Sequence, residues 1–350
     1  MRNSHGQKIA IRVDASSQIG SGHAFRCLAL ADALSRRGVK PIFICGEIPK
    51  EYDSLIQKRG YQLYIFSLSK SDWQEDAAAT EEILKGQGIV DWLIVDNYSL
   101  DSRWERQMRP RGRRIMVVDD LANRPHDCDL IVDQNFGTEA ANYKELVPRN
   151  CHGLFGPKFA LLRKEFADER RESSTASVPD GEVVHVFFGT ADLTNYTGRF
   201  SRLLANHFLK LKLEVVTGNF FRDSEELVLL GKTFNSRVNW HNNLDNMIPI
   251  MRRCSIAFGA PGITTWERAC MGLPAAYLAV NKNQKRKLTR LEKMGLCAYL
   301  GAAEDISDED FVGKFSGFIA DEKKRMDMRK LSLSLVDGLG ADRVASFLLT

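Results

Sequence analysis

The feature that most constrains the fold is a regular alternation of short apolar runs with longer segments of helical period. Six runs rich in β-branched and aromatic residues occupy the first half of the chain, and six more follow residue 182. They are residues 8–13, 41–45, 61–66, 91–96, 114–119 and 129–133, then residues 183–188, 212–217, 236–240, 254–258, 274–280 and 297–300. Strands that alternate with helices form parallel sheets covered by helices. The sequence therefore predicts an α/β protein with two parallel sheets.

A polar stretch separates the two sets of strands. Residues 173–181 (SSTASVPDG) show no apolar period and contain one proline, which is typical of a linker. We therefore expect an N-terminal domain over 1–172 and a C-terminal domain over 182–350. Residues 340–350 are predicted to form a closing helix that can pack back on the first domain. Parallel α/β sheets bind ligands beyond the carboxyl ends of their strands, so the sequence predicts an active site in a cleft between the two domains.

Composition excludes several classes of protein. The 49 Lys and Arg against 45 Asp and Glu leave a net charge of +4, which does not favour a nucleic-acid binder. No apolar run reaches the roughly 18–20 residues of a membrane span, and the start, MRNSHGQK, lacks the apolar stretch of a signal peptide. We expect a cytoplasmic protein without stable membrane association. The seven cysteines form no C-x-x-C pair and the seven histidines no H-x-x-x-H pair, so neither a disulfide framework nor a metal site is expected.

The first glycine-rich turn follows the strand that ends at residues 13–14. Gly20 and Gly22 flank the turn, and an amphipathic helix is predicted to start near His23, with Arg26 on the same face. The positive end of a helix disfavours the imidazolium, which would leave His23 neutral and able to act as a general base. The spacing equally allows His23 to cap the helix and Arg26 to be a solvated charge. Asp14, at the end of the strand, has an alternative interpretation as a turn-capping residue.

The second glycine-rich turn, GAPGITTWE, lies in the C-terminal half. A carboxylate at Glu267 could accept both hydroxyls of a ribose, while a helix start presents backbone N–H groups to a diphosphate. The residues that would present them are Gly262, Ile263, Thr264 and Thr265, and Asn283 and Gln284 at the end of the next strand could reach the same ligand. This pattern predicts nucleotide-sugar binding. Glu267 could also simply cap its helix.

The third turn, FFGTADLTN, spans residues 187–195. Gly189 and Asp192 precede a helix that is predicted to start near Asn195, and all three are candidates for ligand contact. Ordinary strand-to-helix turn chemistry explains them equally well.

Several long motifs in one order resemble a known enzyme family. They are RVDASSQIGSGHAFRCLALADAL, VDNYSLDSRWE, VDDLANRPHDCDLIVDQN, LFGPKFALLRKEF, FGTADLTNYT and GITTWERACMGLP. The sequence resembles the UDP-2,4-diacetamido-2,4,6-trideoxy-β-L-altropyranose hydrolases of pseudaminic acid biosynthesis, relatives of the MurG-like glycosyltransferases. The resemblance implies a GT-B-like fold, with two Rossmann-like domains whose parallel sheets face a central cleft. It also implies a metal-independent, inverting hydrolase that needs no cofactor and releases UDP and the free sugar.

The resemblance also implies roles for individual residues. His23 matches the histidine considered catalytic in the family, the turn with Glu267 matches the uridine-ribose site, and Asn283 matches an asparagine near the reacting sugar. Asp14 and Asn283 are counted with His23 as catalytic candidates. Asn97, Tyr98 and Asp119, at strand ends of the first half, are candidates to hold acetamido or hydroxyl groups of the sugar.

Two departures from the family pattern bear on the substrate. Pro261 has no N–H where the family has a second glycine, and Ile263 has no hydroxyl where the family has a small hydroxyl residue. Thr190 replaces a glycine of a usual pair. Two other functions share the predicted fold: a glycosyltransferase that uses UDP-sugars, and a nucleotide-sugar-binding homologue without catalysis. The expected partner is a UDP-linked diacetamido sugar, with no nucleic acid, and the expected assembly is a monomer or a weak homodimer.

Overall fold

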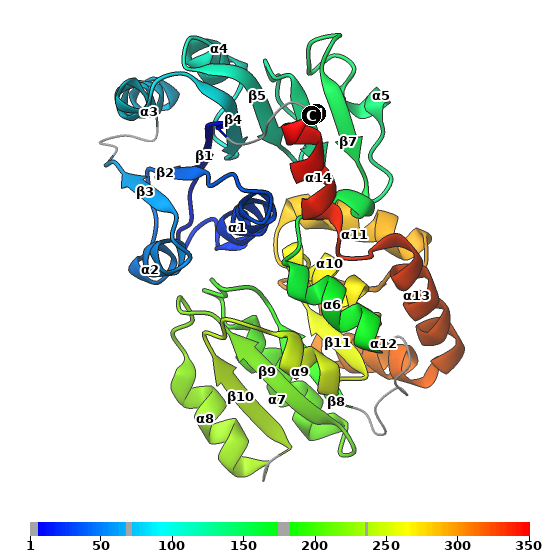
Figure 1. The fold of residues 1–350 in the computed structure, drawn as a ribbon. Helices are drawn as coiled ribbons and strands as arrows, with labels where there is room; N and C mark the ends of the chain where they lie inside the picture. The colour runs from blue at the N-terminus through cyan, green and yellow to red at the C-terminus, as the bar shows by residue number, and fades with distance from the viewer. Residues whose placement is uncertain (1–5, 68–71, 174–182, 235–236) are drawn as a thin grey trace. The chain divides into compact units, whose positions relative to one another are not determined.

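Two compact units make up the chain in its computed structural model. The structure describes residues 6–67, 72–173, 183–234 and 237–350. Unit 1 comprises Met1–Lys164 and Gly338–Thr350, and unit 2 comprises Glu165–Asp337. Each unit is built on a sheet whose described strand pairs are all parallel (Figure 1). The α/β class and the two Rossmann-like halves predicted from the sequence are confirmed.

Unit 1 contains a seven-stranded sheet in the order β3-β2-β1-β4-β5-β6-β7. Its strands are β1 Ile9–Val13, β2 Ile42–Cys45, β3 Gln62–Ile65, β4 Val90–Asp96, β5 Gly112–Val118, β6 Leu130–Asp133 and β7 His152–Phe155. Its helices are α1 Gly22–Ser35, α2 Lys50–Lys58, α3 Trp73–Gln87, α4 Ser102–Met108, α5 Ala140–Tyr143, the 3₁₀ turn η1 Pro157–Phe159 and α14 Gly340–Leu349. The chain order reverses between β1 and β4, which makes this pair the switch point of the sheet.

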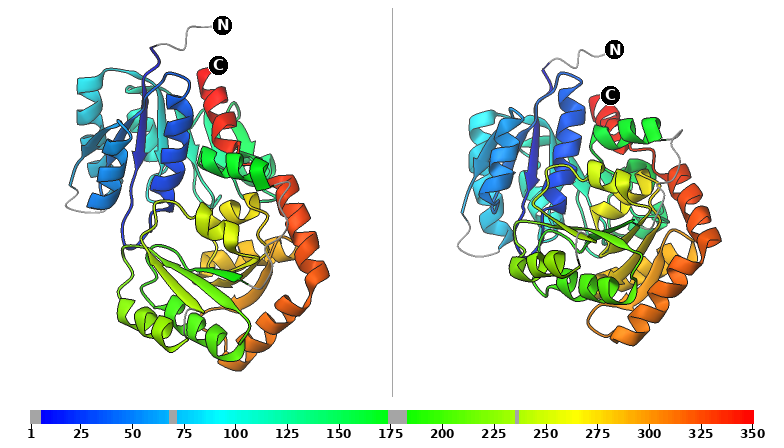
Figure 2. Two further views of the ribbon diagram at one scale, coloured as in Figure 1. Left: turned by 60° about the horizontal axis from the view of Figure 1, so that its bottom comes forward. Right: turned by 90° about the horizontal axis from the view of Figure 1, so that it is seen from below.

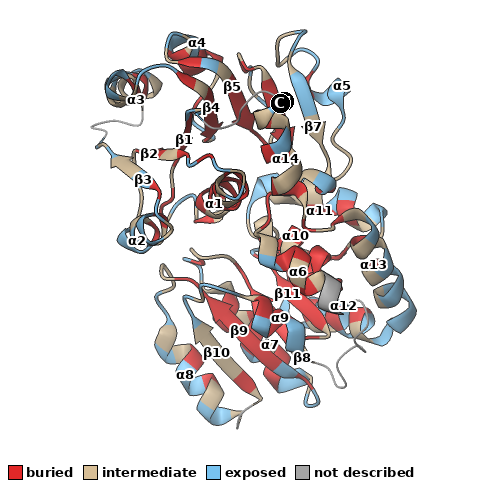
Figure 3. Cartoon of the chain, in the orientation of Figure 1, coloured by how far each residue is buried: buried red, intermediate tan, exposed pale blue. Residues whose placement is uncertain are grey.

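Helices cover both faces of the unit 1 sheet, because successive strand residues point to opposite sides. In β4, Trp92 and Ile94 enter the core that α1 and α14 complete, whereas Leu93 and Val95 enter the core beneath α3 and α4. Strands that are buried on both faces read as continuous apolar runs, which is why the sequence reveals them. Figure 3 shows the central strands buried, while α2 and α3 carry exposed residues.

Unit 2 contains a six-stranded sheet in the order β10-β9-β8-β11-β12-β13, with its switch point between β8 and β11. Its strands are β8 Val183–Phe187, β9 Lys212–Thr217, β10 Val238–Asn242, β11 Ile256–Gly259, β12 Ala275–Ala279 and β13 Ala298–Ala302. Its helices are α6 Lys164–Ser173, which begins on the last residue of unit 1, and α7 Tyr196–His207, α8 Ser224–Thr233, α9 Ile248–Arg253, α10 Ile263–Cys270, α11 Lys282–Lys293, α12 Asp308–Ala320 and α13 Glu322–Leu335.

An aromatic core fills one face of the unit 2 sheet. Phe200 of α7 lies 5.8 Å from Phe258 of β11 and 4.8 Å from Phe311 of α12, measured between ring centroids. Phe188 lies 5.3 Å from Phe258. Such edge-to-face and tilted pairs add to the burial of apolar surface. The opposite face carries the polar residues His185 and Arg268, which are both fully buried.

All twelve strands predicted from the apolar runs occur, and the predicted helices near residues 23, 195 and 340 are α1, α7 and α14. Strand β7 was not predicted; it is only four residues long and half exposed at the edge of its sheet. The predicted linker, residues 173–181, lies outside the described residues except for residue 173, which ends α6.

The observed division of the chain differs from the predicted boundary at residues 165–172, while the closing helix packs back on the first unit as the prediction allowed. Residues 165–172 lie in unit 2, because α6 is held there: Arg252 donates to Glu169 at 2.6 Å, and Arg170 donates to the carbonyl oxygen of Leu333 at 2.6 Å. Residues 338–350 lie in unit 1, because α14 packs against α1. The helix α14 therefore belongs to the N-terminal sheet rather than to the C-terminal one.

The contact between α14 and unit 1 combines apolar burial with ion pairs. Leu348 is fully buried in the same core as α1, and Trp92 Nε1 donates to the carbonyl oxygen of Leu348 at 2.8 Å. Asp342 accepts from Arg37 at 2.6 Å and from Arg36 at 3.0 Å. Both views of Figure 2 show α14, in red, beside the blue α1. The helix α14 thus completes the apolar core that contains β1 and α1.

Truncation of the Leu348 side chain tests whether α14 completes the core of unit 1. We expect Leu348→Ala to lower the stability of unit 1 by about 2–5 kcal/mol, because the substitution leaves a cavity in a closed core. Hydrogen exchange should show faster exchange in α1 and β1, with β8 and β11 unchanged. Thr350→Ala, at an exposed position of the same segment, is the control. Equal protection of α1 in both variants would contradict the assignment of α14 to this core.

Candidate functional site

A pocket of about 430 Å³ opens in unit 1 beyond the carboxyl ends of β1 and β4. Val13 and Asp96 are paired across these two strands, so the residues that follow them emerge side by side at the switch point. The pocket is lined by Asp14, Ser16, Gln18, Ile19, His23, Gly46, Glu47, Ser67, Asp72, Trp73, Asp76, Asp96, Asn97, Tyr98, Ser99 and Leu100. Four sequence-predicted residues meet here: Asp14, His23, Asn97 and Tyr98. The site is rich in carboxylates and carries aromatic and apolar groups at its wall.

His23 is held by a carboxylate that the sequence analysis missed. Its Nδ1 lies 2.6 Å from Oδ1 of Asp96, and Asp96 also accepts from Arg26 through both oxygens at 2.6 Å. Burial would raise the pKa of Asp96, but the charges and hydrogen bonds of Arg26 and His23 outweigh it and hold this pKa well below its usual range. Asp96 is therefore an anion bound to Nδ1 of His23, which leaves Nε2 as the ring nitrogen that this carboxylate does not hold.

The position of His23 follows from the start of α1. Gly20 has a φ of 75°, and its N–H donates to the carbonyl oxygen of Ser16 at 2.8 Å, so the chain turns sharply into the helix at Gly22. His23 and Arg26 lie three residues apart on one face of α1, and both reach Asp96. Arg26 is buried rather than solvated, and the alternative of a solvated first-turn charge is wrong.

Tyr98 closes one side of the imidazole. The two rings are in edge-to-face contact with centroids 4.5 Å apart. The hydroxyl of Tyr98 donates to Asp120 at 2.7 Å, and Asp120 also accepts from Arg26 at 3.1 Å. Burial and the charge of Asp120 raise the pKa of Tyr98, so the phenol stays protonated. Arg26 is thus shared between Asp96 and Asp120, and Tyr98 is fixed against His23.

Asp14 is engaged from several sides by groups of the protein. Arg12 donates to both of its oxygens at 2.5 and 2.8 Å, the N–H of Gly46 donates to Oδ1 at 2.7 Å, and Asn97 Nδ2 donates to Oδ2 at 2.7 Å. Arg12 is fully buried and also donates through Nε to Asp76 at 3.1 Å. This geometry orients Asn97 and the turn after β2. A catalytic role of Asp14 stays a prediction.

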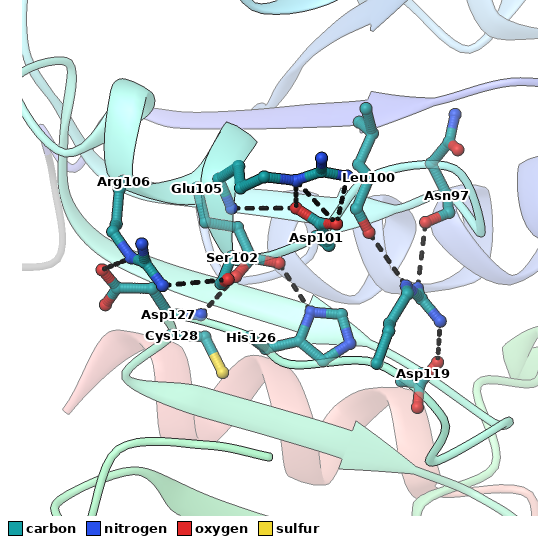
Figure 4. Close-up of polar contacts among 12 residues, drawn as sticks. Asn97, Leu100, Asp101, Ser102, Glu105, Arg106, Asp119, His126, Asp127 and Cys128 are labelled. Atoms are coloured by element: carbon teal, nitrogen blue, oxygen red, sulfur yellow. Dashed lines mark hydrogen bonds and ion pairs between the residues drawn. The ribbon is translucent and has the colours of Figure 1, made fainter. Parts of the chain in front are cut away.

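Arg124 connects the two loops that follow β4 and β5, through contacts with residues that Figure 4 labels in both loops. Its guanidinium donates to the carbonyl oxygens of Asn97 and Leu100 at 3.1 and 2.9 Å and to Asp119 at 2.8 Å. Asp119 is 1% exposed and does not line the pocket, so its oxygens support the loop instead.

A second contact in Figure 4 anchors the same loop to α4. The buried Glu105 accepts from His126 Nδ1 at 2.7 Å and from the backbone N–H of Asp127. Glu105 and His126 are both removed from solvent, and this pair fixes the segment that ends just before β6. The loop that carries Asp119 and Asp120 is therefore held at both of its ends.

Behind this loop, Tyr143 donates to two carboxylates, Asp119 at 2.8 Å and Asp133 at 3.0 Å. Burial raises the pKa of Asp133 to about 6; the hydrogen bond from the N–H of Asn135 opposes this rise, and the charge of Asp120 adds to it. The folded chain thus keeps a proton on Asp133 at a pH where the unfolded chain has lost it. The folded state therefore becomes less stable as the pH rises from about 4 to above 6.

Asp133→Asn removes this titration. The raised pKa corresponds to at most about 3 kcal/mol, so the opening free energy of amides in β5 and β6 should fall less between pH 4.5 and 7.5 in the variant than in the natural chain. Hydrogen exchange at the two pH values measures it. Asp308→Asn, which removes an exposed carboxylate, is the control for lost charge. The same pH dependence in Asp133→Asn and the natural chain would refute the assignment.

In unit 2, the predicted nucleotide turn lies at the other switch point. Gly259 has a φ of 146°, and a Cβ there would meet the carbonyl oxygen of Phe187 at 1.9 Å, so only glycine fits between β11 and β8. The helix α10 then begins at Ile263, where the N–H of Gly262 donates to Thr265 Oγ1 at 3.2 Å. Glu267 follows in the middle of α10, with its side chain partly exposed.

The predicted residues on either side of this turn have roles within the protein. Gln284 accepts from the N–H of Val280 at 2.8 Å and donates to the carbonyl oxygen of Pro261 at 3.4 Å, which ties the end of β12 to the turn. Asn283 is exposed in the first turn of α11. Thr264 and Thr265 are buried in the first turn of α10. Ligand contact by these residues stays a prediction.

The third predicted turn caps a helix. Asp192 accepts from the N–H groups of Tyr196 and Thr197 at 3.0 and 2.7 Å, and Asn195, in the left-handed region with a φ of 56°, accepts from Gly198 at 2.8 Å. Gly189 has a φ of 102°, which favours glycine. Turn chemistry accounts for all three residues, and their contact with a ligand stays a prediction.

The residues at the two switch points that the sequence did not predict share one property. Arg12, Asp76 and Asp96 in unit 1, and Arg268 and His185 in unit 2, are buried ionisable groups at or near the switch points. The signal for Asp96 was present, because it ends an apolar strand directly before Asn97. Across the described ranges, no group of three or more His, Cys, Asp or Glu side chains is placed to hold a metal ion. None of the helices in these ranges is both long and apolar enough to cross a membrane.

No protein-family model matches the chain. The fold is nevertheless shared with solved structures along almost the whole chain. MurG of Acinetobacter baumannii superposes with a TM-score of 0.64 and 11% identity over 98% of this chain and 99% of its own. MnaA of S. aureus, solved with UDP, gives a TM-score of 0.66 and 12% identity over 97% and 94%. The chain therefore has a GT-B-like fold of two Rossmann-like units.

Sequence similarity narrows the likeness to particular proteins. The UDP-2,4-diacetamido-2,4,6-trideoxy-β-L-altropyranose hydrolase of Campylobacter jejuni is 34% identical over 167 residues, which cover 47% of this chain and 56% of that protein. An uncharacterized protein of Methanocaldococcus jannaschii is 26% identical over 79% of this chain and 57% of its own. The spore coat polysaccharide biosynthesis protein SpsG of Bacillus subtilis is 28% identical over 30% and 31%. The resemblance to the hydrolase is confirmed, and the chain spans little more than half the length of the first two relatives.

Proposed function

We propose that the chain hydrolyses the anomeric C–O bond of a UDP-linked 2,4-diacetamido-2,4,6-trideoxy sugar and releases the free sugar and UDP. This reaction would serve the synthesis of pseudaminic-type nonulosonic acids. The observation that carries the proposal is the Asp96–His23 pair at the wall of the unit 1 pocket. The partial similarity to the Campylobacter jejuni hydrolase supports the substrate class.

The proposed base is Nε2 of His23. Because Nδ1 is bound to Asp96, Nε2 is the nitrogen that can take a proton from water as the water attacks the anomeric carbon. The anionic Asp96 then stabilises the imidazolium that forms, as a carboxylate does in catalytic triads. Attack from the side opposite to UDP inverts the anomeric centre. The diphosphate is a good leaving group, so this reaction needs a strong base more than a strong acid.

The lining of the pocket supports a neutral, polar ligand. Asp72, Asp76 and Glu47 bring negative charge to the wall, which disfavours a phosphate and favours hydroxyl and amide N–H donors. Ile19, Trp73 and Leu100 add apolar surface that suits the methyl groups of acetamido and deoxy positions. A diacetamido trideoxy sugar offers both kinds of group. Unit 1 would therefore bind the sugar.

Unit 2 would bind the nucleotide. The N–H groups of Ile263 and Thr264 at the start of α10 would favour a diphosphate, whereas those of Gly262 and Thr265 are bound within the turn. Glu267 would accept the ribose hydroxyls. Asn283, at the start of α11, would approach the reacting sugar.

The reaction is tested by incubating the purified chain with the UDP-linked diacetamido sugar in ¹⁸O-water without any acceptor. Phosphorus resonance should show stoichiometric release of UDP, and mass spectrometry should find the label in the sugar. Label in UDP would overturn the proposed bond cleavage. UDP release only after addition of an alcohol acceptor would indicate a glycosyltransferase, and UDP binding without turnover of any diacetamido sugar would indicate a binding protein.

His23→Asn isolates the base. We expect kcat to fall by about 10²- to 10⁴-fold with a modest change in KM, because the substitution removes proton transfer and leaves the binding groups in place. His207→Asn, at an exposed histidine at the end of α7, is the matched control and should keep the natural kcat. If kcat of His23→Asn stays within about threefold of the natural chain, His23 is a structural residue and the mechanism fails.

A further inference from the structure

A fully buried arginine lies beneath the nucleotide turn of unit 2. Arg268, on α10, is 0% exposed and donates through NH2 to the carbonyl oxygens of Phe187 and Phe258 at 3.2 and 3.1 Å. Its Nε donates to His185 Nδ1 at 3.3 Å, and its guanidinium lies 5.3 Å from the ring centre of Tyr277. The guanidinium thus touches the last residue of β8 and the residue before Gly259 in β11.

This charge has no counter-ion in the described part of unit 2. No carboxylate there forms an ion pair with Arg268, and its NH1 atom has no hydrogen-bond partner. Burial and the charge of Arg268 lower the pKa of His185 well below its usual value, so this ring is neutral, and its Nε2 is also without a partner. A buried cation normally requires a paired anion. Among the described residues, Arg268 therefore meets only dipoles at ion-pair distance. Glu214, which lies opposite His185 in the strand register, is itself paired with His241 and Arg253.

The charge lies close to the first turn of α10. Helical side chains tilt toward the N-terminus, so the guanidinium reaches back from position 268 toward the strand ends that flank Gly259. Arg268 lies three residues after Thr265 on the same face of α10, and Thr265 accepts from the N–H of Gly262 at 3.2 Å. The guanidinium thus lies close to the turn where we place the diphosphate, because Phe258 directly precedes Gly259 and the carbonyl oxygen of Phe187 lies against Gly259.

We propose that Arg268 is a positioning residue for a nucleoside diphosphate bound at the first turn of α10, and that its unpaired charge supplies the affinity for the phosphates without touching them. The proposal rests on the nucleotide binding proposed above. It explains how this chain can bind a diphosphate although Pro261 has no N–H and Ile263 no hydroxyl to offer. Through a low-dielectric interior, an unpaired charge acts on an anion over a longer range than it would in water.

Substitutions at His185 test the charge without removing Arg268. His185→Glu places a carboxylate beside Nε of Arg268, whereas His185→Gln has a similar size and no charge. We expect His185→Glu to bind UDP about tenfold or more weakly than His185→Gln. Both variants should bind uridine equally, because uridine carries no phosphate. Calorimetry for UDP and ligand resonance for uridine give the dissociation constants, and thermal unfolding checks the fold.

Substitutions of Arg268 itself give a second, independent comparison. Arg268→Met keeps most of the volume and removes the charge, and Arg268→Lys keeps the charge. UDP should bind about tenfold or more weakly to Arg268→Met, with affinity largely restored in Arg268→Lys, while uridine affinity stays level in both. This pair of variants tests the role of the Arg268 charge in UDP binding if the His185 variants do not fold.

The outcomes separate the two proposals. Equal UDP affinity of His185→Glu and His185→Gln, or a parallel loss of UDP and uridine affinity, overturns the role of the charge. UDP binding that follows the charge, in a chain that does not hydrolyse the diacetamido sugar, supports the role of Arg268 and refutes the hydrolase. A natural chain that does not bind UDP refutes both.

Discussion

The candidate site depends on one buried carboxylate, Asp96, and on the hydrogen bonds that this carboxylate must accept. A carboxylate that is 1% exposed is stable as an anion only when strong donors surround it, and here Arg26 and His23 supply them. Both donors come from the first turns of α1, so satisfying the charge of β4 also fixes the start of α1 against the sheet. The orientation of the imidazole is therefore a consequence of folding, and no ligand is needed to establish it.

Arg12 is a second buried cation on the β1–β4 strand pair, and carboxylates pair with it in the same way. Arg12 lies inside the sheet at β1 and is shared between Asp14 and Asp76, as Arg26 is shared between Asp96 and Asp120. Each arginine connects a strand end to a loop or helix that lines the pocket. Because breaking one partner of such a cluster leaves a buried charge, these contacts resist distortion. We therefore expect the pocket wall that carries His23 to keep its geometry.

The sequence predicted the strands and the local motifs well and the long-range partners poorly. Twelve strands were visible because burial on both faces makes them continuously apolar, whereas β7, with His152 and Gly153 at a sheet edge, is not. His23 and Arg26 were visible together because they are three residues apart. Asp96 lies 73 residues after His23, and only the order of strands, with β4 beside β1, brings it there. The burial of Arg268 could not be predicted from the sequence either, because the helix α10 is short and mixes polar and apolar residues.

The buried arginines of the two units differ in the groups that surround them. In unit 1 every buried arginine is matched by carboxylates, and further carboxylates line the pocket, so the local potential opposes phosphates. In unit 2 the guanidinium of Arg268 is matched only by dipoles, those of two carbonyl groups and a neutral imidazole. Dipoles satisfy the hydrogen bonds of a cation but leave its charge in place. Under the proposed function, this difference in charge would favour the neutral sugar at unit 1 and the anionic diphosphate at unit 2.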